Sequence, residues 1–130
     1  MVARFLEWIY KKININEQHR NVKYIAEGQV FWCSLGENIG YEQNGKGLYF
    51  RRPVLILKKF SNNLFWGVPM STVIKDNRYY VIVTLQNVKQ SALISQLRVL
   101  DSKRLDEFVG YISKKDLEII RLMITNLLKN

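Results

Sequence analysis

The pattern of hydrophobic positions divides the chain into a helical N-terminal segment and a longer, strand-rich part. Over residues 1–21, apolar side chains recur at helical spacing with charged residues on the opposite side, which predicts an amphipathic helix. Its apolar stripe consists of Val2, Phe5, Leu6, Trp8, Ile9 and Ile13. We expect this stripe to pack on the rest of the domain, although a basic amphipathic helix can also lie on a membrane or dock a partner.

From Gly28 onward the pattern changes to short runs of β-branched and aromatic residues separated by polar turns. These runs predict strands over residues 29–35, 53–57, 64–70, 79–84 and 92–100, of which 53–57 is apolar enough to be buried on both faces. Asp101 and Ser102 predict the start of a short helix over 103–109, and Ser113 or Asp116 begins a final helix. The order predicts a mainly β protein with helices (α+β), built as a small antiparallel sheet or barrel that a helix covers.

Composition narrows the choice of partner. The chain has 130 residues, which suits one domain, and 48% of them are hydrophobic, so we expect a folded core. Lys and Arg number 20 against 11 Asp and Glu, which gives a net charge of +9. This excess favours an anionic partner, namely nucleic acid, an acidic protein segment or a membrane surface, although basic charge can also serve solubility alone. Because no secretory signal and no membrane-spanning run is found, we expect a soluble, cytoplasmic protein with no membrane role.

Several common chemistries lack the residues they need. Cys33 is the only cysteine and His19 the only histidine, so an intrachain disulfide is excluded and a zinc site lacks ligands. A Ser-His-Asp triad would have only His19, and no GKS or GKT follows the glycines as in a P-loop. We expect no metal and no cofactor, a buried Cys33 and a solvated His19. The chemistry that remains is that of arginine, carboxylate and hydroxyl groups acting on an anion.

Residues 35–72 hold the groups that could carry this chemistry. A glycine-rich loop contains Glu42 and leads into Arg51 and Arg52, directly before the rigid apolar strand, and the next strand ends in two hydroxyls, Ser71 and Thr72. If the two strands pair, the hydroxyls lie close to Arg52. An arginine held by a strand can clamp a phosphate with its planar fork and stabilise extra charge in a phosphorane-like transition state. Such a set suits cleavage of single-stranded RNA without metal, with the substrate 2′-OH as nucleophile.

The same residues also allow simpler interpretations. Two arginines beside a strand are usually solvated charges, and hydroxyls at the end of a strand usually satisfy turn backbones. Basic residues with aromatic residues nearby also fit a non-catalytic binder of single strands, which stacks bases on aromatic rings. The aromatic residues concerned are Tyr41, Tyr49, Phe50, Phe60 and Trp66, and they can equally belong to the core.

Three motifs in order carry a family resemblance. The first is Gly40-Tyr41-Glu42-Gln43-Asn44-Gly45 followed by Arg52-Pro53, the second is Val68-Pro69-Met70-Ser71-Thr72, and the third is the segment from Gln96 to Arg98. Together they resemble the PemK/MazF family of toxins of type II toxin–antitoxin systems. The resemblance covers roughly residues 28–128. It divides the chain into residues 1–27, a helix and connector, and residues 28–130, a PemK/MazF-like domain.

The resemblance implies an SH3-like small antiparallel β-barrel, with an N-terminal helix and C-terminal helices packed on it, that works as a homodimer. It implies a metal-independent endoribonuclease, or mRNA interferase, that cuts single-stranded RNA to leave 2′,3′-cyclic phosphate and 5′-OH ends. A cognate antitoxin would bind as an extended acidic segment along the RNA groove. Carried over by position, the implied catalytic residues are Arg52, Ser71 and Glu42, and the implied RNA-binding residues are Gln43, Arg51, Lys58, Thr72, Gln96 and Arg98.

Two positions depart from the family pattern. Ser71 stands where threonine is usual, which keeps the hydroxyl, and Ser95 stands where several members have an aspartate that acts as base. Glu42 is then the remaining candidate for the general base. The loss of that aspartate leaves open a non-enzymatic relative of the same fold that binds RNA or poisons a gyrase. A generic basic nucleic-acid module, with an accidental motif match, is the third alternative.

Overall fold

The structure is a computed structural model that describes residues 2–18 and 24–129. The prediction for His19 therefore lies outside the described residues. The elements, in chain order, are α1 (Val2–Glu17), β1 (Gln29–Ser34), β2 (Arg51–Lys59), β3 (Leu64–Ser71), β4 (Tyr80–Leu85), β5 (Val88–Leu93), the 3-10 turn η1 (Ile94–Gln96), β6 (Arg98–Asp101), the 3-10 turn η2 (Ser102–Arg104), β7 (Leu105–Tyr111) and α2 (Lys114–Lys129).

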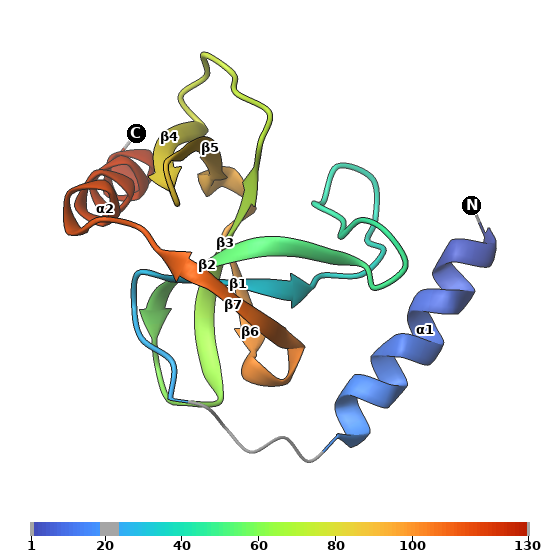
Figure 1. Cartoon of the computed structure of the whole chain (residues 1–130). Coiled ribbons are helices and arrows are strands. Elements are labelled where there is room, and N and C mark those ends of the chain that lie inside the picture. The colour runs from blue at the N-terminus through green and yellow to red at the C-terminus, as the bar shows by residue number, and fades with distance from the viewer. Residues whose placement is uncertain (1, 19–23, 130) are drawn as a thin grey trace.

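The strands form one antiparallel sheet in the order β4-β5-β3-β2-β1-β7, and β6 pairs with the other end of β3. The sheet is strongly curled, with β2 and β3 crossing its middle and the β4–β5 hairpin folded over toward α2 (Figure 1). The two ends of the sheet approach each other: the side-chain amide of Gln86, in the β4–β5 turn, donates to the Val109 carbonyl of β7. The predicted mainly β fold with helices, compatible with a barrel, is confirmed.

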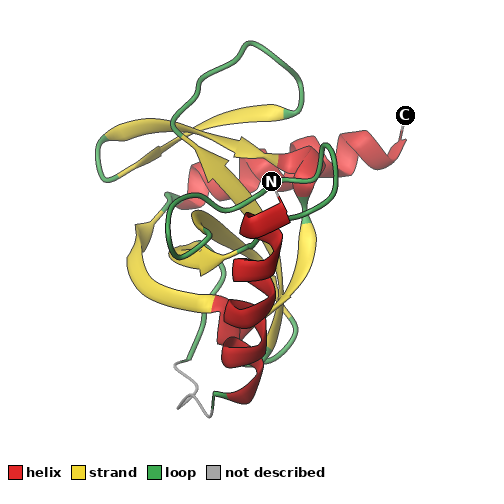
Figure 2. Cartoon of the chain, turned by 90° about the vertical axis from the view of Figure 1, so that its right-hand side faces the viewer, coloured by secondary structure: helices red, strands yellow, loops and turns green. Residues whose placement is uncertain are grey.

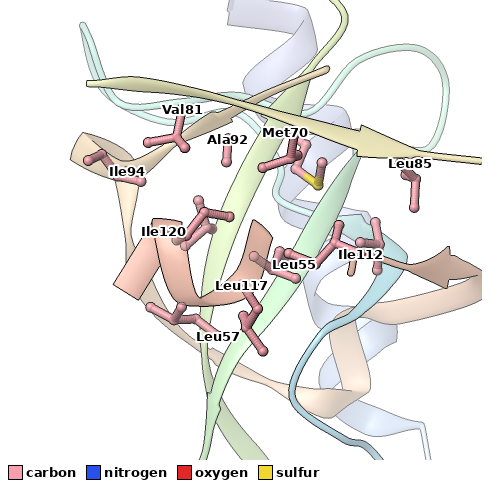
Figure 3. Close-up of a cluster of buried hydrophobic side chains, with 13 residues drawn as sticks. Leu55, Leu57, Met70, Val81, Leu85, Ala92, Ile94, Ile112, Leu117 and Ile120 are labelled. Carbon is pink, nitrogen blue, oxygen red and sulfur yellow. The ribbon is translucent and has the colours of Figure 1, made fainter. Parts of the chain in front are cut away.

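The core lies on both faces of the central hairpin. Along β2, Leu55 and Leu57 belong to one buried cluster, whereas Val54 and Ile56 belong to another on the opposite face. This alternation confirms the expected strand buried on both faces. Helix α2 covers the first cluster with Leu117 and Ile120, and Figure 3 shows these side chains directed at the sheet. The helix begins directly after Ser113, one of the two expected starts, whose hydroxyl accepts from the Asp116 amide at 3.1 Å.

The prediction of one strand over residues 92–100 was wrong. The chain leaves β5 after Leu93, makes η1 and continues as β6, so that β5 and β6 pair with opposite ends of β3. Between these two ladders, β3 contains Pro69, which has no amide hydrogen to donate. The ladder along this side of β3 is interrupted there, and the neighbouring strand breaks at the same level.

The prediction of a helix over residues 103–109 was also wrong. The Asp101 side chain does cap a turn, accepting from the Lys103 amide at 2.8 Å, but that turn ends at Arg104. The next residues form β7, which pairs with β1 through Phe31 opposite Phe108 and Val30 opposite Gly110. The free edge of β1 needs backbone partners, and this pairing between residues far apart in sequence overrides the local helix signal.

Helix α1 packs on the domain by a different face from the predicted one. Only Trp8 and Ile15 of the helix are buried, whereas the other members of the apolar stripe are exposed. These exposed members are Val2, Phe5, Leu6, Ile9 and Ile13. Cys33 on β1 is fully buried, as expected for a small apolar residue. None of the described helices is long and apolar enough to cross a membrane.

Candidate functional site

A pocket of about 380 Å³ opens where β2 begins and β3 ends. The two strands pair antiparallel with Val54 opposite Pro69, so the residues before Val54 and after Pro69 come to the same end of the hairpin. The side chains around it are Trp32, Lys46, Leu48, Tyr49, Arg51, Arg52, Pro53, Met70, Ser71, Thr72 and Gln90, with Gly47. The hairpin therefore brings together four predicted site residues that are about twenty positions apart in the sequence.

Arg52 lies half-buried against the backbone of the glycine-rich loop. Its Nε donates to the Asn44 carbonyl at 2.7 Å, and one terminal nitrogen donates to the Met70 carbonyl at 3.5 Å. When the Gln43 amide is turned so that its oxygen faces the guanidinium, this oxygen accepts from Arg52 at 2.6 and 2.8 Å. All of these acceptors are neutral, so they orient the guanidinium without cancelling its charge.

Burial lowers the pKa of Arg52 from its usual value, and the nearby Tyr80 phenol opposes that effect. Among the ion pairs of the described residues, none joins Arg52 to a carboxylate. A partly desolvated cation without an anionic partner costs free energy that an anion would recover on binding. The arrangement can therefore accommodate a negatively charged group such as phosphate.

Ser71 is half-buried at the end of β3. Its hydroxyl oxygen accepts from the Val73 amide at 3.1 Å, so it does satisfy a turn backbone, as one of the simpler interpretations has it. Because the hydroxyl is the acceptor in this bond, its own proton is still available to a ligand in the pocket. Thr72 follows on the pocket wall and is exposed.

The structure does not bring Glu42 to the pocket. Its carboxylate accepts from the Ile39 amide at 2.9 Å, within a turn at the far end of the loop, and the side chain is exposed. No acidic residue is among those that line the pocket. A role for Glu42 as base therefore requires the loop to change conformation.

Gln96 acts on the loop rather than on the pocket. Its side-chain oxygen accepts from the Gln43 amide at 3.0 Å, and its nitrogen donates to the Tyr41 carbonyl at 3.1 Å. The oxygen and the nitrogen of one side-chain amide thus hold residues 41–43 of the loop. Gln43 and the following Asn44 in turn contact Arg52. This places Gln96 as a support for the arginine.

Replacing Gln96 with glutamate tests this support. The carboxylate can still accept from the Gln43 amide but cannot donate to Tyr41, so one of two bonds is lost. One such bond contributes about 0.5–1.5 kcal/mol, so we expect the rate of any reaction that depends on Arg52 to fall about 3- to 10-fold. Gln96→Ala should fall further, and equal activity of both variants and the wild type would contradict the role.

Arg51 contributes to the pocket from a different position. Its guanidinium lies 5.3 Å from the ring centroids of both Trp32 and Tyr49 and pairs with Asp106 at 3.8 Å. Its charge is thus partly offset, unlike that of Arg52. The remaining predicted RNA contacts are not part of the pocket lining. Lys58 is exposed near the opposite end of β2, and Arg98 lies on β6 opposite Gly67.

Sequence reasoning missed several residues that shape the site. Asn38 organises the loop, because its side-chain nitrogen donates to the Leu35 and Gln43 carbonyls at 3.1 and 2.8 Å. The backbone amide of Asn38 donates to the side-chain oxygen of Asn44 at 2.6 Å. Asparagines in a glycine-rich loop are a signal for such local bonds. The signal for Trp32 in the sequence is weaker. Side chains alternate along β1, so Trp32 lies on the opposite face of the strand from the buried Phe31 and Cys33.

No group of three or more His, Cys, Asp or Glu in the described part of the chain could hold a metal ion. The groups that the pocket offers include two guanidiniums, a lysine, the hydroxyls of Ser71 and Thr72, and the rings of Trp32 and Tyr49. Such a set is chemically able to bind and polarise a phosphate and to offer ring surfaces for base stacking.

Comparison with known proteins identifies the family. A sequence model described as the PemK-like, MazF-like toxin of type II toxin–antitoxin systems matches residues 26–128. The chain belongs to this family, as its motifs predicted. A search among curated proteins found no match.

The fold is that of solved MazF structures. MazF from Deinococcus radiodurans is 24% identical with a TM-score of 0.70, over 83% of this chain and 99% of that one. An endoribonuclease from a mycobacterial species is 14% identical with a TM-score of 0.63, over 85% and 96% of the two chains. A MazE–MazF complex from D. radiodurans is 21% identical with a TM-score of 0.62, over 82% and 96%.

Proposed function

We propose that the protein is a metal-independent endoribonuclease that cleaves single-stranded RNA, mRNA in particular, and acts as the toxin of a type II toxin–antitoxin system. The observation that supports this most is the half-buried Arg52 guanidinium, which has only neutral partners and shares a pocket with the Ser71 hydroxyl. The family match and the likeness to a protein described as an endoribonuclease point the same way.

In the proposed reaction, the substrate 2′-OH attacks the adjacent phosphorus. A 2′-oxygen–phosphorus bond forms, the 5′-oxygen–phosphorus bond breaks, and the products carry a 2′,3′-cyclic phosphate and a 5′-OH. The Arg52 fork stabilises the added negative charge on the phosphate oxygens, and the Ser71 hydroxyl donates to one of them. The proton from the 2′-OH goes to a base, and a proton is supplied to the departing 5′-oxygen, with Arg52 proposed as the acid.

Glu42 is the proposed base. In the present conformation its carboxylate is bonded to the Ile39 amide outside the pocket, so we expect substrate binding to move the loop before the proton is taken. The exposed Tyr49 ring and the half-buried Trp32 ring line the pocket, and unstacked bases can lie on them. Gln43, Arg51 and Thr72 are proposed contacts around the scissile phosphate. Gln96 is proposed to serve RNA binding indirectly, by supporting the loop that holds Gln43. Lys58 and Arg98 would serve more distant phosphates.

The proposed partners follow from the charge and the family. A net charge of +9 suits RNA and also an acidic antitoxin segment. The solved neighbours include MazE–MazF complexes and an endoribonuclease in complex with its cognate antitoxin. We propose that this protein likewise binds a cognate antitoxin and works as a cytoplasmic homodimer.

A second candidate is a toxin of the same fold that binds RNA, or poisons a gyrase, without cutting RNA. Two observations favour it: no carboxylate lines the pocket, and Ser95, on η1, is exposed and is not among the residues that line the pocket.

Cleavage of single-stranded RNA in EDTA distinguishes the candidates. We expect the purified protein to cut the RNA strand and not a DNA strand of the same sequence, because DNA lacks the 2′-OH. End-group analysis should find cyclic phosphate on one product and 5′-OH on the other. Intact RNA with retained binding, or loss of gyrase supercoiling with intact RNA, would select the second candidate and reject the first.

A further inference from the structure

Helix α1 lies along the loop that connects β1 to β2, residues 35–50, and not only against the sheet. Figure 2, which looks at the molecule from the side of α1, shows this helix in front of the strands with the loop at its N-terminal half. The helix precedes the region that matches the family, residues 26–128. It is therefore a feature of this chain that the family pattern does not explain.

An aromatic contact fixes the helix to both ends of the loop. Trp8 is only 5% exposed and Phe50 only 2%, and their ring centroids are 5.5 Å apart. The same Trp8 ring covers Gly36 so closely that a Cβ at this position would lie 2.0 Å from it. Position 36 also has a φ of +83°, which favours glycine. The loop is thus shaped to accept this particular side chain of α1.

Arg4 adds a polar clamp one turn earlier on the helix. Its Nε donates to the Glu37 carboxylate at 2.8 Å, and its terminal nitrogens donate to the Gly47 and Gly45 carbonyls at 3.1 and 3.4 Å. The guanidinium also lies 4.1 Å from the centroid of the Phe50 ring. One side chain therefore ties the beginning, the middle and the end of the loop together.

The clamped residues are neighbours of the groups that form the pocket. Gly45 follows Asn44, whose carbonyl accepts from Arg52, and Gly47 lies in the run from Lys46 to Tyr49 that lines the pocket. Phe50 directly precedes Arg51 and Arg52. A shift of the loop would thus move both the acceptor that orients Arg52 and the wall on which a base stacks.

We propose that α1 is a positioning element of the site, in which Trp8 and Arg4 hold the loop in the conformation that orients Arg52 toward RNA. This inference rests on the proposed RNA cleavage for its functional part. The substrate does not need to touch the helix. The clamp acts through the loop, so it should affect the rate of the chemical step more than the affinity for RNA.

The test compares point variants of the full chain in steady-state cleavage of a single-stranded RNA. Trp8→Ala is expected to lower kcat about tenfold with little change in KM, since small displacements of catalytic groups are costly. Arg4→Lys keeps the charge but not the three-pronged fork, so it should lower kcat as well. If α1 merely attracted RNA by charge, Arg4→Lys would behave as wild type, and that result would overturn the proposal for Arg4.

Two variants on the same helix serve as controls. Leu6→Ala removes an exposed apolar side chain and Lys12→Ala removes an exposed charge, and neither contacts the loop in the hydrogen bonds and ring contacts described above. Both should retain the wild-type kcat. If they lose as much activity as Trp8→Ala, the helix acts in some other way and the clamp is rejected.

Amide hydrogen exchange decides the structural part without any RNA. Trp8→Ala and Arg4→Lys should raise exchange at residues 35–50 while the amides of β2 and β3 stay protected. Unchanged loop exchange would overturn the clamp, and faster exchange with wild-type kcat would overturn its role in positioning. If the wild-type protein itself does not cut RNA, the proposed function fails, whereas the exchange experiment still shows whether α1 holds the loop.

Discussion

Replacement of Arg52 by alanine is expected to lower kcat for RNA cleavage about 100- to 1000-fold, the loss typical when one preorganised donor to a developing oxyanion is removed. Among the described residues, the hydrogen bonds of the Arg52 guanidinium go to neutral acceptors alone, so its full positive charge is available to the phosphate in the pocket. Arg52→Lys should recover little of the loss, since an ammonium cannot keep the bond to Asn44 and still present a fork to phosphate. Rates measured with saturating single-stranded RNA in EDTA give the comparison.

Two further variants show whether the effect belongs to this position. Arg51→Ala should lose less, because Asp106 already offsets part of its charge and its contacts are with aromatic rings. Lys115→Ala removes an exposed charge from α2 and should leave the rate unchanged. Circular dichroism should show the folded sheet in all of them. Cleavage by Arg52→Ala at the wild-type rate would refute the proposed site, and equal losses in all variants would point to bulk charge instead.

The central hairpin, and the presence of Arg52 and Ser71 at the same pocket, could be predicted from sequence because the signals are local. Two apolar runs separated by a short polar turn predict two antiparallel strands that pair as a β-hairpin. The residues just outside these runs must then meet at the open end. The glycine-rich loop, in contrast, gave only its composition. The position of Glu42 depends on bonds within the loop, such as that to the Ile39 amide, which the motif does not reveal.

The errors share one cause, which is competition from partners distant in sequence. Residues 103–109 follow a good helix start, yet from Leu105 onward they pair with β1, more than seventy positions earlier. In α1 the regular apolar stripe pointed to one face, whereas the contact that decides its docking joins Trp8 to Gly36 and Phe50. A glycine gives no apolar signal, so hydrophobic periodicity cannot find its partner.

Gly45→Ala is the second change for which we expect a large effect. A Cβ at this position would lie 1.7 Å from the Phe50 carbonyl oxygen and 2.7 Å from the Arg51 nitrogen, so the obstacle is backbone that cannot rotate away. That carbonyl already accepts from the Leu35 and Gly36 amides. The two sides of the loop must therefore separate, which should cost about 1–3 kcal/mol of stability. Displacement of Asn44, the acceptor of Arg52, should lower kcat about 100-fold.

Gly40→Ala is the matched control, because it places the same methyl group in the same loop without a clash. No atom lies within 4 Å of the position that a Cβ would take there, although a φ of +55° makes alanine strained at this residue. The control thus carries the backbone strain, whereas Gly45 has no positive φ and carries only the clash. Thermal unfolding and cleavage rates should separate the two variants. If Gly40→Ala loses as much kcat as Gly45→Ala, the flexibility of the loop governs the reaction, and its close packing around residues 45–50 does not.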